Sequence, residues 1–501
     1  MKNKISKFFV MVGITLSSLL YLGCTNLDET VYNQITPETF FKSEEEFFAA
    51  LVPLYAQLRP FLWSYYNLSQ VSSDETIVPT RGGDWGDGGR WRAMYQHTWD
   101  KTLPDVNDAW NDAFTGVARA NSYLKSMELV PNTSAAKPRF VAEARVLRGL
   151  YYYLLMDLFG GVPIVTDLVD RANPPARNSR QEVFNFIEKE VTESIAALPE
   201  AATGDSGRLT KNSARALLAR MYLNAGVFTG SAQWQKTLDM CDAIINSGVQ
   251  KLEGSFFDNF IPTNEKSKEG LLVIGYANID LGFPGMNFTM RTGHYNQVPQ
   301  SPWNGFCTIA EYYDSFDPQD VRSKMFQAGQ AVNLLTGEPV NNRQGAPLIF
   351  TKEVPIENAN EGNGIRVLKW GVDPLQNGGD SRNDFFVFRY SEIFLTKAEA
   401  LNELGRTTEA TALINVIRGR AFNPAKPLSS SFTQATFRQQ ILKERGFELG
   451  WEASRRQDLI RIGGYTAART NKLVSQSFRN LFPIPQRAID ANPKLSQNPG
   501  Y

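Results

Sequence analysis

The sequence AEARVLRGLYYYLLMDLFGGVP, residues 142–163, decides the fold. Apolar residues recur along it at steps of three and four, which places them on one face of a helix. The glycine pair at 160–161 and Pro163 end the pattern, because both residue types are poor helix formers. The stretch therefore predicts a helix that packs through one apolar face, made of Val141, Ala144, Leu147, Tyr151, Leu154, Leu155 and Leu158.

The same periodicity continues on both sides of this stretch. Glycines at 226 and 248 are expected to end two of the helices, because glycine is common just past a helix terminus. The further predicted helices are Glu44–Leu62, Asn107–Met127, Gln181–Leu198, Thr210–Asn224, Gln233–Ser247 and Phe437–Ile460.

Residues 389–421, RYSEIFLTKAEALNELGRTTEATALINVIRGRA, predict two helices joined at Gly405. Small alanines stand where the two helices would approach each other, as in tetratricopeptide-type hairpins. A clean 34-residue period does not run through the chain. We therefore expect degenerate repeats, of which Thr210–Ser247 and Tyr390–Ala421 are the best two.

The pattern changes between residues 251 and 384. Glycine, asparagine, proline and aromatic residues become frequent, and LLVIGYA (271–277) and DFFVFRY (384–390) indicate short strands. The sequence predicts a mainly α fold in which a helical scaffold (about 36–250 and 385–465) carries a loop-rich insertion (about 251–384) within a single domain, 24–501. Long loops on a rigid scaffold are where binding residues concentrate.

Charge and cysteine content exclude several classes of protein. The chain has 52 basic and 52 acidic residues, so no net charge favours nucleic acid as a partner. Three cysteines are too few for a disulfide framework or a zinc ribbon. A bridge between Cys241 and Cys307 is conceivable, but two buried free thiols are the expected arrangement.

The first residues have the form of a secretory signal. Lys2, Lys4 and Lys7 precede an apolar run over residues 8–22, which is shorter than the roughly 20 residues of a membrane span. The run ends at Gly23-Cys24, which resembles a lipobox, so residues 1–23 are expected to be a lipoprotein signal peptide and Cys24 the lipidated residue. The alternative is a plain cleaved signal with an unrelated cysteine. Several acyl chains on one residue would anchor the protein stably to a membrane.

An early loop, SSDETIVPTRGGDWGDGGRWRAMYQHTW (72–99), holds tryptophans among glycines and charges. Sugar rings offer an apolar C–H face to aromatic rings and hydroxyl groups to short polar side chains. A binding site for carbohydrate therefore needs exposed aromatic rings beside Asp, Asn or Arg on a rigid frame. Arg81, Asp84, Trp85 and Trp91 meet this description, and Trp85 is the ring least expected to lie in the core.

A second cluster with the same composition lies at RTGHYNQVPQSPWNGF (291–306). Its candidate ligand-binding residues are Tyr295, Asn296, Trp303 and Asn304. Other prominent residues are expected to be structural: Trp99 and Trp110 as core side chains, and His97 as a hydrogen-bonded histidine.

No recognisable catalytic motif is present. H-E-x-x-H, G-x-S-x-G and the Walker glycine loop are all missing. A glycosidase that uses two of Asp74, Glu75, Asp84 and Asp87 is one alternative, but such acids usually follow strands, which are few here. A calcium ion held by Asp84 and Asp87 is another, although the loop lacks the ligands of an EF-hand. We expect a protein without catalysis, metal or cofactor.

The segment ERGFELGWEASRRQDLIR (444–461) alternates charges and could be mistaken for an active site. We interpret it as a structural ion-pair network within and between helices. Its members would be Arg445, Glu448, Glu452, Arg455, Arg456 and Asp458.

Six stretches together resemble one family, the SusD/RagB outer-membrane glycan-binding lipoproteins. They occur in the order typical of the family and extend from the cysteine to the last tyrosine. The stretches are GCTNLDE (23–29), EARVLRGLYYYLLMDLFGGVPIV (143–165), RLTKNSARALLARMYLNAG (208–226), FRYSEIFLTKAEALNELG (388–405), ERGFELGWEASRRQDLIRIG (444–463) and LFPIPQRAIDANPKLSQNPGY (481–501).

The resemblance implies a SusD-like fold with four tetratricopeptide-like units and an irregular ligand-binding half. It implies a lipid-anchored protein at the cell surface, on the outer membrane, that captures glycans and delivers them to a TonB-dependent SusC-type β-barrel transporter. It also implies that the early loop and the 251–384 loops approach each other, so that both clusters line one groove. The alternative within the family is a member that binds peptides or proteins.

Overall fold

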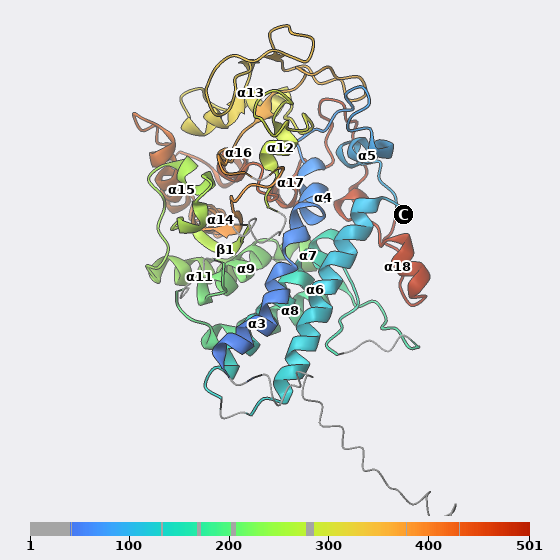
Figure 1. Ribbon diagram of the computed structural model, residues 1–501. Coiled ribbons are helices and arrows are strands. Elements are labelled where there is room, and N and C mark those ends of the chain that lie inside the picture. Colours follow the sequence, from blue (N-terminus) through green and yellow to red (C-terminus); the bar gives the residue numbers. More distant parts are fainter. Residues whose placement is uncertain are drawn as a thin grey trace, which may run out of the picture. The chain divides into compact units, whose positions relative to one another are not determined.

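The computed structural model describes residues 41, 43–131, 134–167, 172–201, 207–276, 285–376, 378–429 and 431–501. Residues Ser43–Tyr501 form one compact unit (Figure 1). The predicted signal peptide (1–23) and Cys24 lie outside the described residues. Among the helices that are described, none is long and apolar enough to span a membrane.

The mainly α prediction is confirmed. The first half of the chain forms α3 (Glu44–Ala56), α4 (Tyr65–Val71), α5 (Arg90–Gln96), α6 (Pro104–Glu128), α7 (Lys137–Phe159), α8 (Arg180–Ser194), α9 (Lys211–Leu223), α10 (Ala225–Thr229) and α11 (Trp234–Asn246). The second half forms α12 (Phe288–Thr292), α13 (Ala310–Asp314), α14 (Tyr390–Glu403), α15 (Thr407–Ala421), α16 (Gln434–Leu449), α17 (Arg455–Ile462) and α18 (Gln486–Ala491).

The remaining elements are short. The strands are β1 (Gly270–Ile274), β2 (Phe326–Gln327), β3 (Gly329–Gln330), β4 (Ile349–Phe350), β5 (Arg366–Val367) and β6 (Phe385–Arg389). The 3-10 helices are η1 (Arg59–Leu62), η2 (Asp87–Gly89), η3 (Ile195–Ala197), η4 (Phe256–Phe260), η5 (Asn264–Lys266), η7 (Val321–Met325) and η8 (Ser477–Asn480).

Helix α7 is the predicted helix of residues 142–159, but it is buried on more than one face. Helices α6, α8 and α3 all pack against it, so that every residue from Val146 to Phe159 is buried. Its three consecutive tyrosines each need an acceptor in this interior. Tyr151 donates to the Leu54 carbonyl (2.6 Å), Tyr152 to the Val165 carbonyl (3.1 Å) and Tyr153 to Gln457 (2.9 Å).

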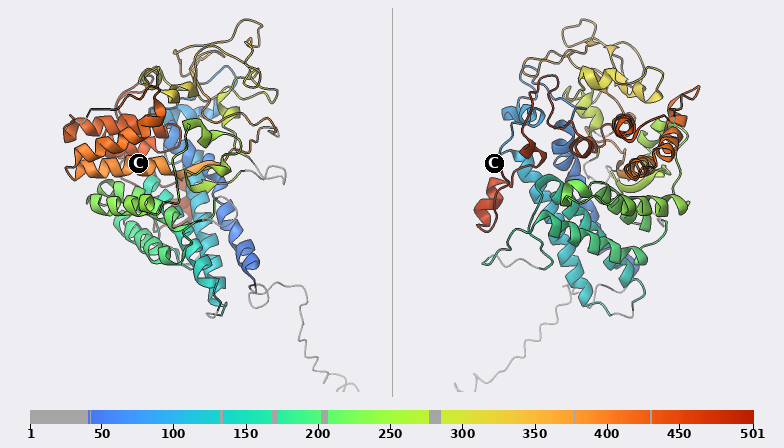
Figure 2. Two further views of the ribbon diagram at one scale, coloured as in Figure 1. Left: turned by 90° about the vertical axis from the view of Figure 1, so that its left-hand side faces the viewer. Right: turned by 180° about the vertical axis from the view of Figure 1, so that it is seen from behind.

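The helical hairpins stack in layers, as the left view of Figure 2 shows. Helices α9 and α11 pair, α11 packs on α14, and α14 pairs with α15 and α16. Both predicted hairpins are present, and Gly405 turns the second one with φ +80°. Gly226 does not end a helix as expected, because it lies inside α10, which stops at Gly230 instead.

The predicted helix 437–460 is wrong as a single element. It divides into α16 and α17 at residues 450–454, where Trp451 and Ala453 have φ of +67° and +61°. The fully buried Trp451 holds this break in place. Its backbone N–H donates to the Glu75 carboxylate (2.8 Å), and its backbone carbonyl accepts from the Tyr66 hydroxyl (3.2 Å).

The two strands predicted from sequence pair with each other. Strand β1 runs antiparallel to β6, and the two segments are more than a hundred residues apart in the chain. The pair therefore joins the two ends of the loop-rich segment to the helical scaffold. Within that segment β2 pairs with β5 and β3 with β4, each over two residues.

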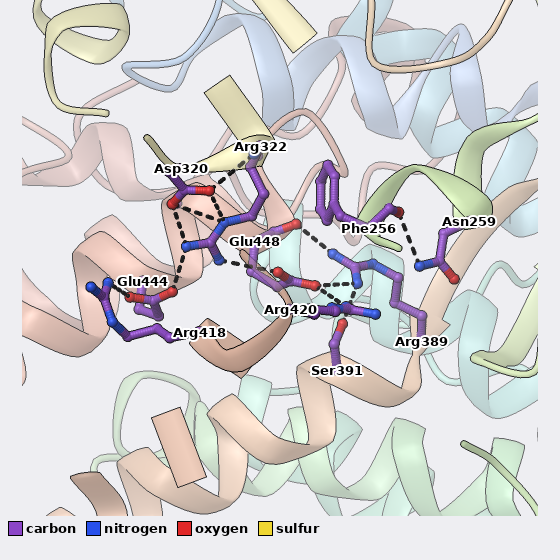
Figure 3. A network of polar contacts seen from close by, with 12 residues as sticks. Phe256, Asn259, Asp320, Arg322, Arg389, Ser391, Arg418, Arg420, Glu444 and Glu448 are labelled. Carbon is purple, nitrogen blue, oxygen red and sulfur yellow. Dashed lines mark hydrogen bonds and ion pairs between the residues drawn. The ribbon is translucent and has the colours of Figure 1, made fainter. Parts of the chain in front are cut away.

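The ion-pair prediction for residues 444–461 is confirmed, and the network is larger than the sequence indicates (Figure 3). Glu448 on α16 accepts from Arg389 at the end of β6 (2.7 Å), from Arg322 in η7 (3.1 Å) and from Arg420 on α15 (2.5 Å). Burial alone would raise the pKa of Glu448, but these three arginines hold it well below its usual value.

Other members of the predicted network also pair, mostly with residues outside the segment. Glu452 accepts from Arg389 and from Lys369, whereas Arg445 pairs with Asp458. Arg455 pairs with Asp74, and Arg456 with Asp157 on α7. The network thus ties α16 and α17 to the early loop, to the central helix and to the loop-rich segment.

Cys241 and Cys307 are both free and buried, as expected. Burial raises the pKa of each thiol, so both are protonated and unreactive.

We predict that Glu448→Gln strongly destabilises the protein. It removes a carboxylate that neutralises three buried guanidinium groups, and breaking such a network costs about 3–5 kcal/mol. Urea denaturation followed by circular dichroism would measure the loss. Glu409→Gln is the matched control, because Glu409 pairs with Arg406 at the surface. Equal denaturation midpoints for the two variants would contradict this role of the network.

Candidate functional site

Three tryptophans from distant parts of the chain come together at the loop-rich end of the molecule. Trp63 follows η1, Trp85 lies in the early loop and Trp303 in the 291–306 segment. The Trp303 ring centroid is 6.2 Å from that of Trp63 and 6.5 Å from that of Trp85. Trp63 is 42% exposed and the other two are half-buried. We call Trp63, Trp303 and Trp85 the tryptophan row.

Trp85 is held in a conformation that an unsupported chain would avoid. Its φ is +61°, and such backbone strain costs on the order of 1–3 kcal/mol, so it persists only where contacts with the rest of the protein offset it. The indole N–H donates to the Trp303 carbonyl (2.6 Å). The ring also lies directly over Gly305, where a Cβ would come within 2.2 Å of it. Trp85 and the 291–306 segment are therefore fitted to each other.

Trp91 packs against the Trp85 ring inside the protein. We predicted that Trp91 contacts a ligand, but its burial contradicts this role. It is only 1% exposed, and its indole N–H donates to Asp87 (2.6 Å). Its ring lies 5.5 Å from Trp85 and 5.2 Å from Phe306. Because a buried ring has no free face, we correct its role to packing beneath Trp85.

Trp63 is the residue that sequence reasoning missed. It sits among apolar residues at the end of a predicted helix, without the glycines and charges that drew attention to Trp85. Arg291 fixes its orientation, with the guanidinium 4.0 Å from the ring centroid. Arg291 is itself buried and held by Asn287, Asn67 and the Leu62 carbonyl. Burial lowers the pKa of Arg291 to about 10, so it remains charged at neutral pH.

Polar side chains continue the site beyond Trp85. The Tyr295 hydroxyl donates to the exposed Asp84 carboxylate (2.5 Å), which joins the two predicted clusters directly. Burial, and to a smaller extent the neighbouring Asp84 carboxylate, raises the pKa of Tyr295 to about 12, so the phenol keeps its proton. Asn296 is exposed and donates to the Asn341 carbonyl (2.8 Å).

Arg81 and Asn304 were also predicted to bind ligand, but both are buried. Arg81 donates to the carbonyls of Asn360 (2.5 Å) and Asn363 (2.8 Å). Asn304 accepts from Arg366 (2.5 Å) and donates to the Glu361 carbonyl (3.2 Å). Their polar groups serve to fasten the loops, so we correct their role to supporting the site. Of the predicted residues, Asp84, Trp85, Tyr295, Asn296 and Trp303 retain exposed surface.

The residues predicted to be structural are confirmed as such. Trp99 and Trp110 are buried, and the Trp99 indole N–H donates to the hydroxyl of Tyr501, the last residue (2.7 Å). His97 is buried between the Ser72 carbonyl (2.8 Å) and the Ser475 hydroxyl (3.0 Å). Burial lowers its pKa to about 2, so His97 is neutral.

The acids of the glycosidase and calcium alternatives have other partners. Asp74 pairs with Arg455, and Asp87 accepts from Trp91. Glu75 is buried and accepts from the Trp451 backbone N–H, and burial raises its pKa to about 7. In the described ranges, no three or more His, Cys, Asp or Glu residues gather in a way that could hold a metal ion.

Comparisons with known proteins agree with this architecture. Residues 27–223 match a family model described as starch-binding and associating with the outer membrane, and residues 341–501 match the SusD family model. SusD-like protein P2 of Formosa agariphila is 25% identical over 98% of this chain and 99% of its own length. The starch-binding protein SusD of Bacteroides thetaiotaomicron is 26% identical over 77% of this chain and 76% of its own.

Solved structures show the same fold. A laminarin-binding SusD-like protein superposes with a TM-score of 0.75 at 24% identity, covering 92% of this chain and all of that one. Surface glycan-binding protein A from Bacteroides uniformis gives a TM-score of 0.74 at 21% identity, covering 91% of this chain and 99% of that one. The two ends of the sequence match these two family models, and the fold is shared with SusD-like structures over 92% of the chain, so the chain is a SusD-like protein.

Proposed function

We propose that this protein binds a glycan across the tryptophan row and does not cleave it. The observation that carries the proposal is the row itself, three partly exposed indole rings at neighbouring positions beside Asp84, Tyr295 and Asn296. Rings with free faces bury the apolar faces of sugars, at roughly 25 cal/mol per Å² of apolar area. The carboxylate, hydroxyl and amide groups are suited to sugar hydroxyls.

The rigidity of the row supports recognition rather than chance exposure. Arg291 fixes Trp63, and the Trp303 carbonyl fixes Trp85. Rings that are ordered before binding lose little conformational entropy when a ligand arrives. The glycan-binding and starch-binding descriptions of the relatives point the same way.

We further propose that the protein acts at the cell surface, where a lipid on Cys24 anchors it to the outer membrane. There it would hand its glycan to a TonB-dependent SusC-type β-barrel transporter. The lipobox-like sequence before Cys24 and the family's association with the outer membrane support this placement. A peptide ligand is the alternative, and the binding screen described next includes peptides for that reason.

We predict that Trp85→Ala and Trp303→Ala each weaken glycan binding by about 1–3 kcal/mol, as expected for an aromatic anchor. A form that lacks residues 1–24 would first be screened on an array of oligosaccharides and peptides. Titration calorimetry with the best ligand would then measure both variants.

Trp234→Ala, a half-buried tryptophan at the start of α11, is the matched control and should bind as the unaltered protein does. Unchanged affinity in both site variants would assign the row to packing alone. Shortening of the bound glycan on prolonged incubation would instead favour the glycosidase alternative.

We predict that Cys24→Ala releases the protein from membranes, because the thiol that carries the lipid is gone. Fractionation of cells that express each form would follow the protein by immunoblot. Cys241→Ala keeps Cys24 and changes only a buried thiol, so it should remain with the membranes. Lipid anchoring would be refuted by a Cys24→Ala protein that stays in the membrane fraction.

We predict that the protein co-purifies with a large β-barrel protein when native outer membranes are solubilised in mild detergent. Mass spectrometry of the affinity-purified material would identify it. The Trp85→Ala variant should still co-purify with the β-barrel protein, because Trp85 is expected to contact the glycan and not the transporter. Isolation as a lone monomer would argue against delivery to a transporter.

A further inference from the structure

A cavity of about 580 Å³ adjoins the Tyr295 end of the site. Its lining includes Arg81, Arg343, Asn360 and Glu361 on the polar side and Ile349 on the apolar side. It borders the site through two residues. Arg343 covers the Tyr295 ring, with 4.2 Å between guanidinium and centroid, and Arg81 forms a backbone bridge with Asp84.

Arg343 is oriented before any ligand arrives. Its Nε donates to the Glu361 carboxylate (2.5 Å), and its own backbone N–H donates to the other oxygen (3.0 Å). Glu361 is held in turn by His294 (3.0 Å). Within the part of the chain that the structure describes, neither terminal amino group of Arg343 has a hydrogen-bond partner, and the side chain is 52% exposed. Two parallel N–H groups are thus free to form a fork, the geometry that matches a carboxylate or sulfate.

The charges around the cavity leave a positive excess. Arg81 lines the cavity, and the fully buried Arg366 shares the Asn363 carbonyl with it as an acceptor. The two arginines also bond to the Asn360 carbonyl, to Asn304 and to the Cys307 thiol, and among the described residues neither pairs with a carboxylate. The Nε of each is buried without an acceptor. Burial, and then the charge of Arg81, lower the pKa of Arg366, as expected for like charges in contact. The guanidinium groups of Arg81, Arg343 and Arg366 therefore outnumber the neighbouring carboxylates of Glu361 and Asp84.

We propose that this cavity is a subsite for an anionic group on the glycan, either the carboxylate of a uronic acid or a sulfate ester. The proposal rests on the proposed function, since the uncharged sugar rings of the same chain would lie on the tryptophan row. The two free amino groups of Arg343 bind the anion directly. Arg81 and Arg366 add a positive electrostatic potential, which water and salt screen only weakly because these two side chains are buried. Ile349 offers an apolar wall to the sugar that carries the charge.

The test compares acidic and neutral glycans of equal length with the form lacking residues 1–24. The panel holds oligogalacturonates and alginate oligosaccharides as uronates, a sulfated galactan, and neutral glucans, galactans and xylans. Binding is measured for the unaltered protein, Arg343→Gln, Arg343→Lys and the control Arg406→Gln, an exposed arginine that also pairs with a glutamate. Circular dichroism of each variant checks the fold.

We expect the protein to bind either a uronate or the sulfated galactan. Whichever of these binds shows whether the anionic group is a carboxylate or a sulfate. Arg343→Gln should weaken this binding by about tenfold or more, because a charge-assisted pair is lost. Arg343→Lys should recover only part of it, since lysine lacks the fork. Added salt should weaken it as well, and Arg406→Gln should have no effect.

Two results would overturn the subsite. If neutral glycans bind as tightly as acidic ones and Arg343→Gln leaves their affinity unchanged while Trp85→Ala lowers it, the anionic subsite is wrong and glycan binding stands. If no glycan in the panel binds, the subsite and the proposed function fail together.

Discussion

Glu448 lies in the interior among three arginines, and the path of much of the chain follows from the need to keep those charges paired. An unpaired buried charge costs far more than a misplaced apolar side chain. The loop-rich segment must therefore place Arg322 beside Glu448 on α16, and β6 must end where Arg389 reaches the same carboxylate. With Arg389 fixed, β6 pairs with β1, and both ends of the loop-rich segment are anchored to the scaffold.

The tryptophan row depends on that anchoring, because no single segment contains it. Trp63 comes from the helical scaffold, Trp85 from the early loop and Trp303 from the loop-rich segment. Each is locked by a contact with another segment, such as the Trp85 N–H with the Trp303 carbonyl. The site is consequently a surface of fixed spacing, which selects ligands by length and shape as well as by composition.

Much of this could be predicted from the sequence, and the limits have a physical cause. Local sequence patterns depend on neighbours in the chain, so α7, both hairpins and the strands β1 and β6 were predictable, but the pairing of these two strands was not. Exposure depends on neighbours in space. Trp85 and Trp91 share the same glycine-rich loop and both pack against Phe306, yet Trp91 is buried and bonded to Asp87 whereas Trp85 keeps exposed surface. Trp63 and the roles of Arg322 and Arg389 gave no local signal, because Arg291 and Trp303, which contact Trp63, and Glu448, which pairs with both arginines, lie far along the chain.

The bond between Trp99 and Tyr501 joins residues 402 positions apart. It closes a part of the interior that also holds His97 and Phe482. The order of the early loop at Trp99 therefore depends on a segment from the other half of the chain as much as on its own sequence. Local opening of the segment around Phe482 and Tyr501 would free the Trp99 ring and loosen the base of the early loop as well.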